Sequence, residues 1–309
     1  MASITVSADT SKRQRKGFNW TPLILLAPAL LFFGVLSAYP IVRMAINSFQ
    51  KYGRAQLMGA PPAWVGGSNY VEAISRSSFL MVFLRTFTFM VVTVVLTIVL
   101  GTLLAMLMMQ LNKFFRLFLS VALLLAWAIP PLTSGIVWGW ILNSNYGVIN
   151  YILTKVTGQN WLGHQWLINP VGFYGVLVVM VVWGAVPFIA FTSYAALSGI
   201  PTEVKEAASI DQAGPAKRFF LIELPYVRSV FIVLIVLSVI WDLTVFTQVV
   251  ALQQVGGIAD ETSTLGTWIY TQGSASGNIG LSAAASVIML VIMLAISVSY
   301  VRQTLNEGN

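Results

Sequence analysis

One carboxylate could do chemistry inside an otherwise apolar segment. Asp242 lies within SVIWDLTVFTQVV, residues 238–250, where most neighbours are apolar. An ionised aspartate at the centre of a membrane helix costs roughly 2.5–3.5 kcal/mol on insertion scales, so it is expected to meet a cation, water or the hydroxyls of a ligand. Ser238 precedes it by four residues and shares its helix face. The alternative is an interhelical hydrogen bond or a capping role near a membrane edge.

The other reactive residue types form no catalytic pattern. Most of the ten carboxylates fall in polar stretches such as Asp260-Glu261, and no acid/base pair is evident. The chain has no cysteine and one histidine, His164, which excludes a disulfide framework and histidine-rich metal chemistry. It also lacks a P-loop pattern, so we expect that it does not itself bind ATP. We therefore predict no enzyme activity, no catalytic residues, no metal site and no cofactor bound by this chain.

Prolines beside aromatic residues mark a second candidate lining of a binding site. Pro130-Pro131 and Pro187 lie inside apolar segments, where each proline removes a helical hydrogen bond and frees a carbonyl. Broken membrane helices are tolerated where they line a cavity. Trp127 precedes the first proline site, and Trp183 and Phe188 flank the second. An aromatic face stacked on a pyranose ring is a common way to hold a sugar; ordinary helix packing is the alternative.

The elements that would position these residues are membrane helices. Apolar residues make up 57% of the chain and charged residues 9%, against about 25% charged residues in soluble domains. The sequence therefore predicts an all-α membrane protein with six transmembrane helices. The predicted spans are residues 22–48, 79–110, 116–143, 170–198, 226–251 and 279–301. A tight turn is expected over 110–116, and a short surface helix over 148–156.

The N-terminal segment is assigned from its charge and from the length of its apolar run. Residues 1–21 are predicted to form a cytoplasmic N-terminal tail, and residues 22–309 one transmembrane domain. A cleaved signal peptide is the alternative, because a basic region precedes an apolar run. The run over residues 23–46 is longer than a signal peptide needs and long enough to cross a bilayer, which favours a retained anchor.

The distribution of basic residues predicts the orientation of the spans. With the N-terminus inside, eleven of the seventeen Lys and Arg residues lie on the cytoplasmic side. These are Lys12, Arg13, Arg15, Lys16, Lys113, Arg116, Lys205, Lys217, Arg218, Arg228 and Arg302. The prediction is a multi-pass protein of the bacterial cytoplasmic (inner) membrane with both termini in the cytoplasm. The net charge of +7 follows this topology and forms no nucleic-acid-binding patch.

The longest polar interruption in the C-terminal half, residues 198–228, has the pattern of two short helices. Thr202 after Pro201 is placed to cap the first helix, and Gly214 to end it. Pro215 then suits the first turn of the second helix, where its missing N–H costs nothing. Small alanines on one face suit docking into a cleft of another protein. A solvated loop is the alternative reading.

The residue order in this interruption resembles the EAA loop of bacterial ABC importer permeases. The match consists of Glu206-Ala207-Ala208, Asp211, Ala213, Gly214, Ile222, Leu224 and Pro225. Gln212 departs from it, because the family usually has glycine there. The resemblance implies a cytoplasmic coupling-helix loop over 199–225, between spans four and five, that contacts an ATP-hydrolysing subunit. The residues implied in coupling to the ATPase are Glu206, Ala207, Ala208, Asp211 and Gly214.

A wider resemblance narrows the family to sugar-importer permeases of the maltose and glycerol-phosphate type. It rests on the six spans, on residues 141–150, and on Gly256-Gly257 followed by Thr262-Ser263-Thr264-Leu265. Ile258 departs from it, because the family has proline after the two glycines. Carried over by position, the implied substrate-binding residues are Trp127, Pro131, Trp183, Gly184, Ala185, Phe188, Ser238 and Asp242.

The expected function is therefore that of a permease subunit of an ATP-driven importer for a di- or oligosaccharide, working by alternating access. The implied partners are a second homologous permease, two ATP-binding subunits that use ATP and Mg, an extracytoplasmic sugar-binding lipoprotein, and membrane lipid. One alternative is a permease for glycerol-phosphate or a polyol, although a phosphate would want Arg or Lys near the site. Others are an ion-coupled secondary transporter and an enzyme acting on membrane lipids.

Overall fold

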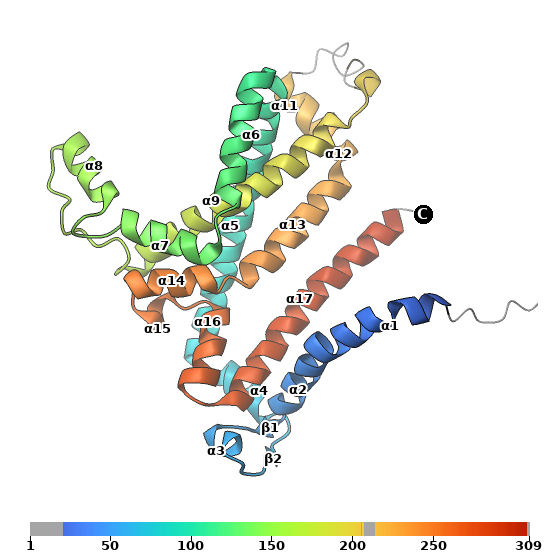
Figure 1. Ribbon diagram of the computed structural model, residues 1–309, viewed down its shortest axis with the longest axis vertical. Helices are drawn as coiled ribbons and strands as arrows, with labels where there is room; N and C mark the ends of the chain where they lie inside the picture. The colour runs from blue at the N-terminus through green and yellow to red at the C-terminus, as the bar shows by residue number, and fades with distance from the viewer. Residues whose placement is uncertain (1–20, 205, 207–213, 308–309) are drawn as a thin grey trace, which may run out of the picture.

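The described part of the chain is mostly helical (Figure 1). A computed structural model describes residues 21–204, 206 and 214–307. The first third contains α1 (Thr21–Phe33), the π-helix η1 (Gly34–Ala38), α2 (Tyr39–Ser48), β1 (Gln50–Lys51), α3 (Arg54–Leu57), β2 (Ala63–Trp64), α4 (Ser68–Ser75) and α5 (Ser77–Gln110). The middle contains α6 (Lys113–Trp127), α7 (Pro131–Ile141), α8 (Val148–Thr157) and α9 (Pro170–Ser198). The last third contains α11 (Pro215–Arg218), η2 (Phe219–Glu223), α12 (Leu224–Tyr226), α13 (Arg228–Leu243), α14 (Thr247–Val255), α15 (Ala259–Thr262), α16 (Leu265–Tyr270), η3 (Thr271–Ala275) and α17 (Ile279–Glu307).

Four stretches of the described chain are long and apolar enough to cross a membrane. They are Ile24–Ser48, Ser77–Gln110, Pro170–Ser198 and Ile279–Ser299, close to predicted spans one, two, four and six. Two bent helix pairs raise the number to six if each pair is counted as one span. The fold is thus that of a mostly helical membrane protein. The tight turn before α6 and the surface helix α8 also lie where the sequence predicts them.

Helices α5 and α9 form the centre of the bundle. They pack along each other more extensively than any other pair of elements. Gly101 of α5 allows the close approach, because a Cβ at that position would collide with Ile189 and crowd the backbone of Ala190. Phe173 and Leu177 of α9 are fully buried in a cluster that also contains Phe89 of α5 and Val249 and Leu252 of α14. This core fixes α9 as the wall against which the other spans are placed.

The predicted third span, 116–143, is two helices and not one. α6 ends at Trp127, α7 begins at Pro131, and their axes differ by 98°. Pro130 adopts an extended conformation (φ −59°, ψ 145°), as expected for a residue that precedes another proline. Pro131 opens α7, where a proline needs no helical hydrogen-bond partner.

The break predicted at Pro187 is absent. α9 runs without interruption from Pro170 to Ser198, with Pro187 inside it and buried. A single proline removes one helical hydrogen bond, and neighbouring helices can tolerate the freed carbonyl. The close packing of α9 on α5 and α14 keeps the helix continuous.

The predicted fifth span, 226–251, is also divided. α13 ends at Leu243 and α14 begins at Thr247, so Asp242 lies in the last turn of α13 and not at a helix centre. The Oγ1 of Thr264 donates a 3.1 Å hydrogen bond to the carbonyl of Val245, inside the break. A second bend, of 83°, separates α13 from the helical run 216–226 that precedes it. That run agrees with the second short helix predicted after Gly214.

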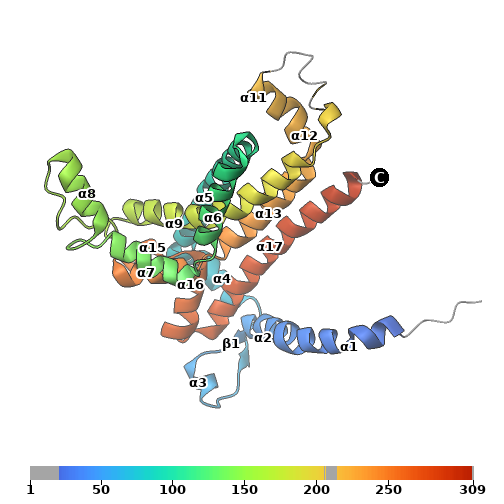
Figure 2. The ribbon, with the colours of Figure 1, turned by 45° about the horizontal axis from the view of Figure 1, so that its top comes forward.

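The first span projects away from the bundle. α1, η1 and α2 form one continuous helical run, and in both views it diverges from α17 toward its N-terminal end (Figures 1 and 2). α2 packs along α17. None of the residues in the apolar window of this span is buried inside the described chain.

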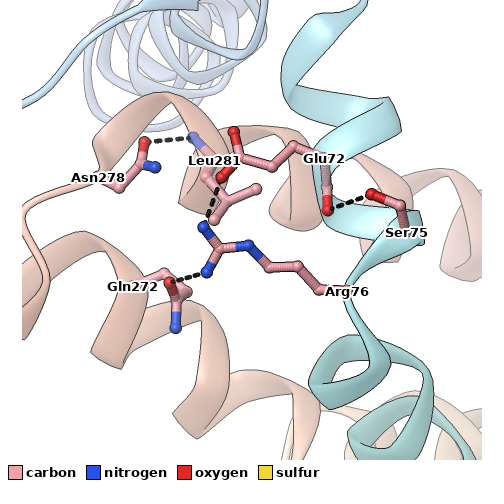
Figure 3. A network of polar contacts seen from close by, with 6 residues as sticks. All are labelled: Glu72, Ser75, Arg76, Gln272, Asn278 and Leu281. Atoms are coloured by element: carbon pink, nitrogen blue, oxygen red, sulfur yellow. Dashed lines mark hydrogen bonds and ion pairs between the residues drawn. The ribbon is translucent and has the colours of Figure 1, made fainter.

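A polar cap, defined here as residues 48–76 and 272–281, joins the ends of α2, α4 and α17. Asn69 donates from Nδ2 to the carbonyls of Ser48 (2.8 Å) and Gln50 (2.9 Å). Arg76 bridges the two parts of the cap, because it contacts Glu72 and donates to Gln272 at 3.4 Å (Figure 3). The cap lies at the opposite end of the molecule from α11 and α12 (Figure 1).

Candidate functional site

A cavity of about 400 Å³ lies where the two broken spans meet α9. Its walls come from the end of α6 and the start of α7, from the middle of α9, and from the end of α13 and the start of α14. The lining residues are Trp127, Ile129, Pro131, Ser134, Met180, Val181, Trp183, Gly184, Ala185, Trp241, Asp242, Thr244, Val245 and Gln248. Because both helix breaks are in its wall, backbone groups outside regular helix are exposed to the cavity, as is tolerated at membrane depth only around a cavity or within protein.

Asp242 is the one acidic residue in the described lining of this cavity. Its residue surface is 4% exposed, and its carboxylate makes no hydrogen bond or ion pair with any other residue that the structure describes. Among the described residues that line the cavity, none is Lys, Arg or His. Buried polar groups in folded proteins nearly always have a partner. A buried carboxylate without a protein partner, at a cavity wall, is therefore available to a ligand or to water.

Three indole rings form much of the apolar wall. Trp127, Trp183 and Trp241 all line the cavity. Phe188 contacts two of them: its ring lies 6.2 Å from that of Trp127, at an interplanar angle of 29°, and 5.3 Å from that of Trp241. Rings that support one another in this way lose less conformational freedom on binding than isolated side chains.

Six of the eight residues predicted to bind substrate line this one cavity. They are Trp127, Pro131, Trp183, Gly184, Ala185 and Asp242. Phe188 contacts two of the tryptophans, as described above. Ser238 is one turn before Asp242 and 5% exposed, and it is not part of the lining. The structure brings these residues together; that they bind a substrate stays a prediction.

The sequence reasoning missed several lining residues, above all Trp241, Thr244 and Gln248. In one continuous helix, Gln248 would point away from Asp242, because a separation of six residues corresponds to about 1.7 turns. The break between α13 and α14 changes that relation and brings both side chains to the cavity. Ser134 was missed for a similar reason, since the bend of 98° before α7 directs its first turn toward the cavity.

A larger groove of about 700 Å³ has a different chemistry. It lies between α5, α6 and α9, and its lining is made of Leu, Val and Ala residues with Trp183. It offers no polar side chain to hold a hydrophilic ligand in one orientation. The smaller cavity, with both polar and aromatic groups, is the candidate binding site.

Part of the region predicted to couple to an ATPase lies outside the described residues: Ala207, Ala208 and Asp211. Glu206 and Gly214 are described and exposed. Further along the chain, Arg218 Nε lies 2.9 Å from Glu223 Oε1, and Glu223 is 3% exposed. The two atoms are close without hydrogen-bond geometry, so the contact is an ion pair at the base of the loop.

Within the described part of the chain, no three His, Asp or Glu residues are gathered closely enough to hold a metal ion.

Comparisons with known proteins place these features in a family context. The family model described as "Binding-protein-dependent transport system inner membrane component" matches residues 97–304. The chain is 33% identical over 287 residues to the diacetylchitobiose uptake system permease protein DasB of Streptomyces coelicolor, covering 93% of this chain and 87% of the relative. It is 28% identical over 283 residues to the sn-glycerol-3-phosphate transport system permease protein UgpA of Escherichia coli, covering 91% and 92%.

Among solved structures, the chain is similar to a chain of a bacterial alginate ABC transporter in complex with an alginate pentasaccharide-bound periplasmic protein. The TM-score is 0.77 at 20% sequence identity, and the match covers 91% of this chain and 92% of that one. A similarity at this identity establishes the fold.

Proposed function

The chain belongs to the family of binding-protein-dependent transport system inner membrane components, and we propose that it carries a di- or oligosaccharide through the cavity at Asp242. As a permease subunit of an ABC sugar transporter it is a transport component and not an enzyme. Family membership also removes the ion-coupled secondary transporter from consideration. The observation that carries the proposal is the cavity itself, with one unpartnered buried carboxylate among three indole rings.

The chemistry of the cavity suits a sugar. A pyranose presents apolar C–H faces and a rim of hydroxyls, which match indole faces and a carboxylate that accepts hydrogen bonds. Charge-assisted hydrogen bonds of this kind are stronger than neutral ones. The volume of about 400 Å³ falls within the range of about 300–1,000 Å³ of small-molecule sites. Thr244, Gln248 and Ser134 add neutral polar contacts along the same wall.

Glycerol-phosphate is the alternative substrate, since one relative named above is a permease for it. Phosphate recognition depends on Arg, Lys or clustered N–H donors. The described lining of this cavity contains no basic side chain, and the carboxylate of Asp242 would repel an anion. A saccharide or neutral polyol is therefore favoured over a phosphate ester.

We further propose how the chain works in a complex. It pairs with a second homologous permease and two ATP-binding subunits, which bind ATP and Mg, and receives sugar from an extracytoplasmic binding lipoprotein in the bacterial cytoplasmic membrane. In this proposal α6 with α7 forms one of the six spans, and α13 with α14 forms another. ATP binding closes the ATPase pair, and the permeases switch the side on which the cavity is open by rigid-body motion.

The loop 199–225 is proposed to couple this chain to an ATPase, through Glu206, Ala207, Ala208, Asp211 and Gly214. Glu206 is exposed, as a contact residue must be. Reversing its charge in Glu206→Lys should uncouple ATP hydrolysis from uptake or weaken assembly, because an unpaired charge at a desolvated contact costs a few kcal/mol. Transport and ATPase stimulation at the wild-type level in this variant would refute the coupling role.

The proposed orientation places both termini in the cytoplasm. The chain has no native cysteine, so single cysteines at Ser144, Ser274 and Ala216 can be labelled separately in intact cells. An impermeant thiol reagent should label the first two from outside and leave Ala216→Cys unlabelled. Labelling of Ala216→Cys from outside would reverse the orientation and remove the loop from the ATPase.

Reconstitution tests the proposed substrate directly. The chain would be purified with the permease, ATPase and binding protein encoded by neighbouring genes and placed in proteoliposomes. Diacetylchitobiose, maltose and other radiolabelled di- and oligosaccharides would be compared with glycerol 3-phosphate. ATP-dependent uptake of a saccharide, with none of glycerol 3-phosphate, is the expected result. Uptake of glycerol 3-phosphate alone would contradict the proposal.

A further inference from the structure

The two helices that follow the breaks stand out as a pair. α7 follows the break at 128–130 and α14 the break at 244–246. The first turn of each helix lines the cavity, through Ser134 of α7 and Gln248 of α14. Both helices lie side by side and away from α11 and α12 in both views (Figures 1 and 2).

Glycine residues set the distance between these helices. Gly135 and Gly139 are one turn apart and buried on the same face of α7. A Cβ at Gly135 would collide with the Cβ of Ala251, and a Cβ at Gly139 with the Cγ2 of Val255. Ala251 and Val255 are themselves one turn apart on α14. Two small residues spaced by four let membrane helices approach to backbone contact, where packing is the main source of stability.

The pair is more tightly joined internally than to the rest of the bundle. α7 and α14 pack on each other more extensively than either packs on α9. The segments that precede the two helices lie outside regular helix, so each helix is separated from the inner half of its span by a break. This is the arrangement expected of a unit that can shift as a rigid body.

On the premise that the cavity carries a saccharide, we propose that α7 and α14 move as one unit during transport, with Gly135 and Gly139 as positioning residues. The glycines seat α14 against α7 so that Val245 and Gln248 form one wall of the cavity. Movement of the unit then changes access to the sugar without separating the two helices, and the wall of the site is preserved.

A reversible cross-link tests whether the helices stay together. In the variant Gly139→Cys/Val255→Cys the two Cβ atoms would be 3.3 Å apart, close to the range of about 3.5–4.5 Å found in disulfides. No other cysteine is present in the chain. The disulfide should form on mild oxidation of the reconstituted importer, and uptake should differ by less than about twofold between the oxidised and reduced states, as expected for rigid-body motion.

Two outcomes would overturn the proposal: failure of the disulfide to form, or arrest of uptake by oxidation with recovery on reduction. The second would show that α7 and α14 separate in the cycle. Uptake by the wild-type complex in the same preparation tests the proposed function separately, because the comparison of oxidised with reduced protein requires only that some saccharide of the panel is transported.

A pair of substitutions that adds a methyl group to α7 and then removes one from α14 tests the positioning role. The ligand is the saccharide that the wild type transports best. Gly135→Ala should weaken its binding about tenfold, because the added methyl group overpacks the contact and shifts α14. Binding is measured on the purified complex by quenching of tryptophan fluorescence. The second substitution Ala251→Gly removes the facing methyl group. The double variant should bind with an affinity within about twofold of the wild type, because substitutions at contacting residues are not additive.

The control is Gly175→Ala in α9, where a Cβ meets no atom within 4 Å, and it should bind as the wild type does. Unchanged affinity in Gly135→Ala would contradict the positioning role. If that variant fails to assemble, the double variant decides: recovery of assembly and affinity supports the proposal, and no recovery overturns it.

Discussion

Buried polar groups are treated in opposite ways in the polar cap and in the cavity. In the cap, Asn69 is 7% exposed, and its Nδ2 donates two hydrogen bonds to backbone carbonyls. Ser48 is fully buried and shares a 2.7 Å hydrogen bond with the Tyr70 hydroxyl. In the cavity, Asp242 is as deeply buried, and its side chain makes no hydrogen bond to a residue that the structure describes.

This difference distinguishes polar groups that stabilise the fold from polar groups that are available to a ligand. A satisfied buried network fixes one geometry of the chain, and the cap does this for the ends of α2, α4 and α17. An unsatisfied buried group lowers stability and persists where it serves another purpose. The cap is therefore expected to respond to mutation through stability, and the cavity through affinity for sugar.

The largest effect is expected from removing the carboxylate in the cavity. Asp242→Ala should weaken sugar binding and uptake about 100-fold, because charge-assisted hydrogen bonds contribute about 1.5–3 kcal/mol each. The assembled complex should form in normal yield and keep its basal ATPase activity. Asp242→Asn, which keeps an acceptor and loses the charge, should fall between. Loss of assembly with unchanged affinity in the surviving complex would place Asp242 with the structural residues of the cap.

The reverse pattern is expected in the cap. Asn69→Ala leaves the carbonyls of Ser48 and Gln50 without a donor, which should cost about 1–3 kcal/mol. The thermal midpoint of the purified complex should fall, with sugar affinity unchanged. A fall in affinity as large as that of Asp242→Ala would show that the two regions are not separate.

A smaller effect is expected from the aromatic wall. Trp183→Ala should weaken sugar binding about tenfold, through loss of one apolar stacking face. The matched control is Trp140→Ala, since Trp140 is 54% exposed and lies outside the cavity lining. Equal effects of the two substitutions would mean that the cavity wall has no special role in binding.

The smallest effect is expected at the surface of the cap. Arg76 and Glu72 form an ion pair whose side chains are each 41% exposed, and such pairs contribute about 0–1 kcal/mol. Arg76→Gln should therefore change the thermal midpoint little and leave uptake unchanged. A loss of stability as large as that of Asn69→Ala would show that the bridge to Gln272 (Figure 3) is more important than its exposure suggests.

Several residues of the cavity could be predicted from the sequence, because acidic residues and prolines are energetically unfavourable in an apolar helix. Asp242 was identified because a carboxylate in an apolar segment needs a reason, and Trp127 and Pro131 because Pro-Pro interrupts a helix. An acidic residue and a Pro-Pro pair are unfavourable in an apolar helix whatever the tertiary fold, although Asp242 lies in the last turn of α13 and not at a helix centre. The positions of spans one, two, four and six follow equally from length and apolar composition.

The remaining part of the site depends on tertiary contacts. Residues 244–246 read Thr-Val-Phe, without the Pro or Gly that marks a break, and the interruption is accompanied by the hydrogen bond from Thr264, nineteen residues later. Pro187 shows the opposite case, because packing keeps α9 helical around a residue that favours a break. Thr244 and Gln248 could therefore be recognised only from the structure.

A structure of the assembled importer with its transported saccharide bound tests the central claim most directly. Sugar density is expected in the cavity, with a hydroxyl within hydrogen-bond distance of the Asp242 carboxylate and a ring face against Trp127 or Trp183. Sugar bound elsewhere, with the carboxylate of Asp242 paired to a basic side chain of the second permease, would contradict it.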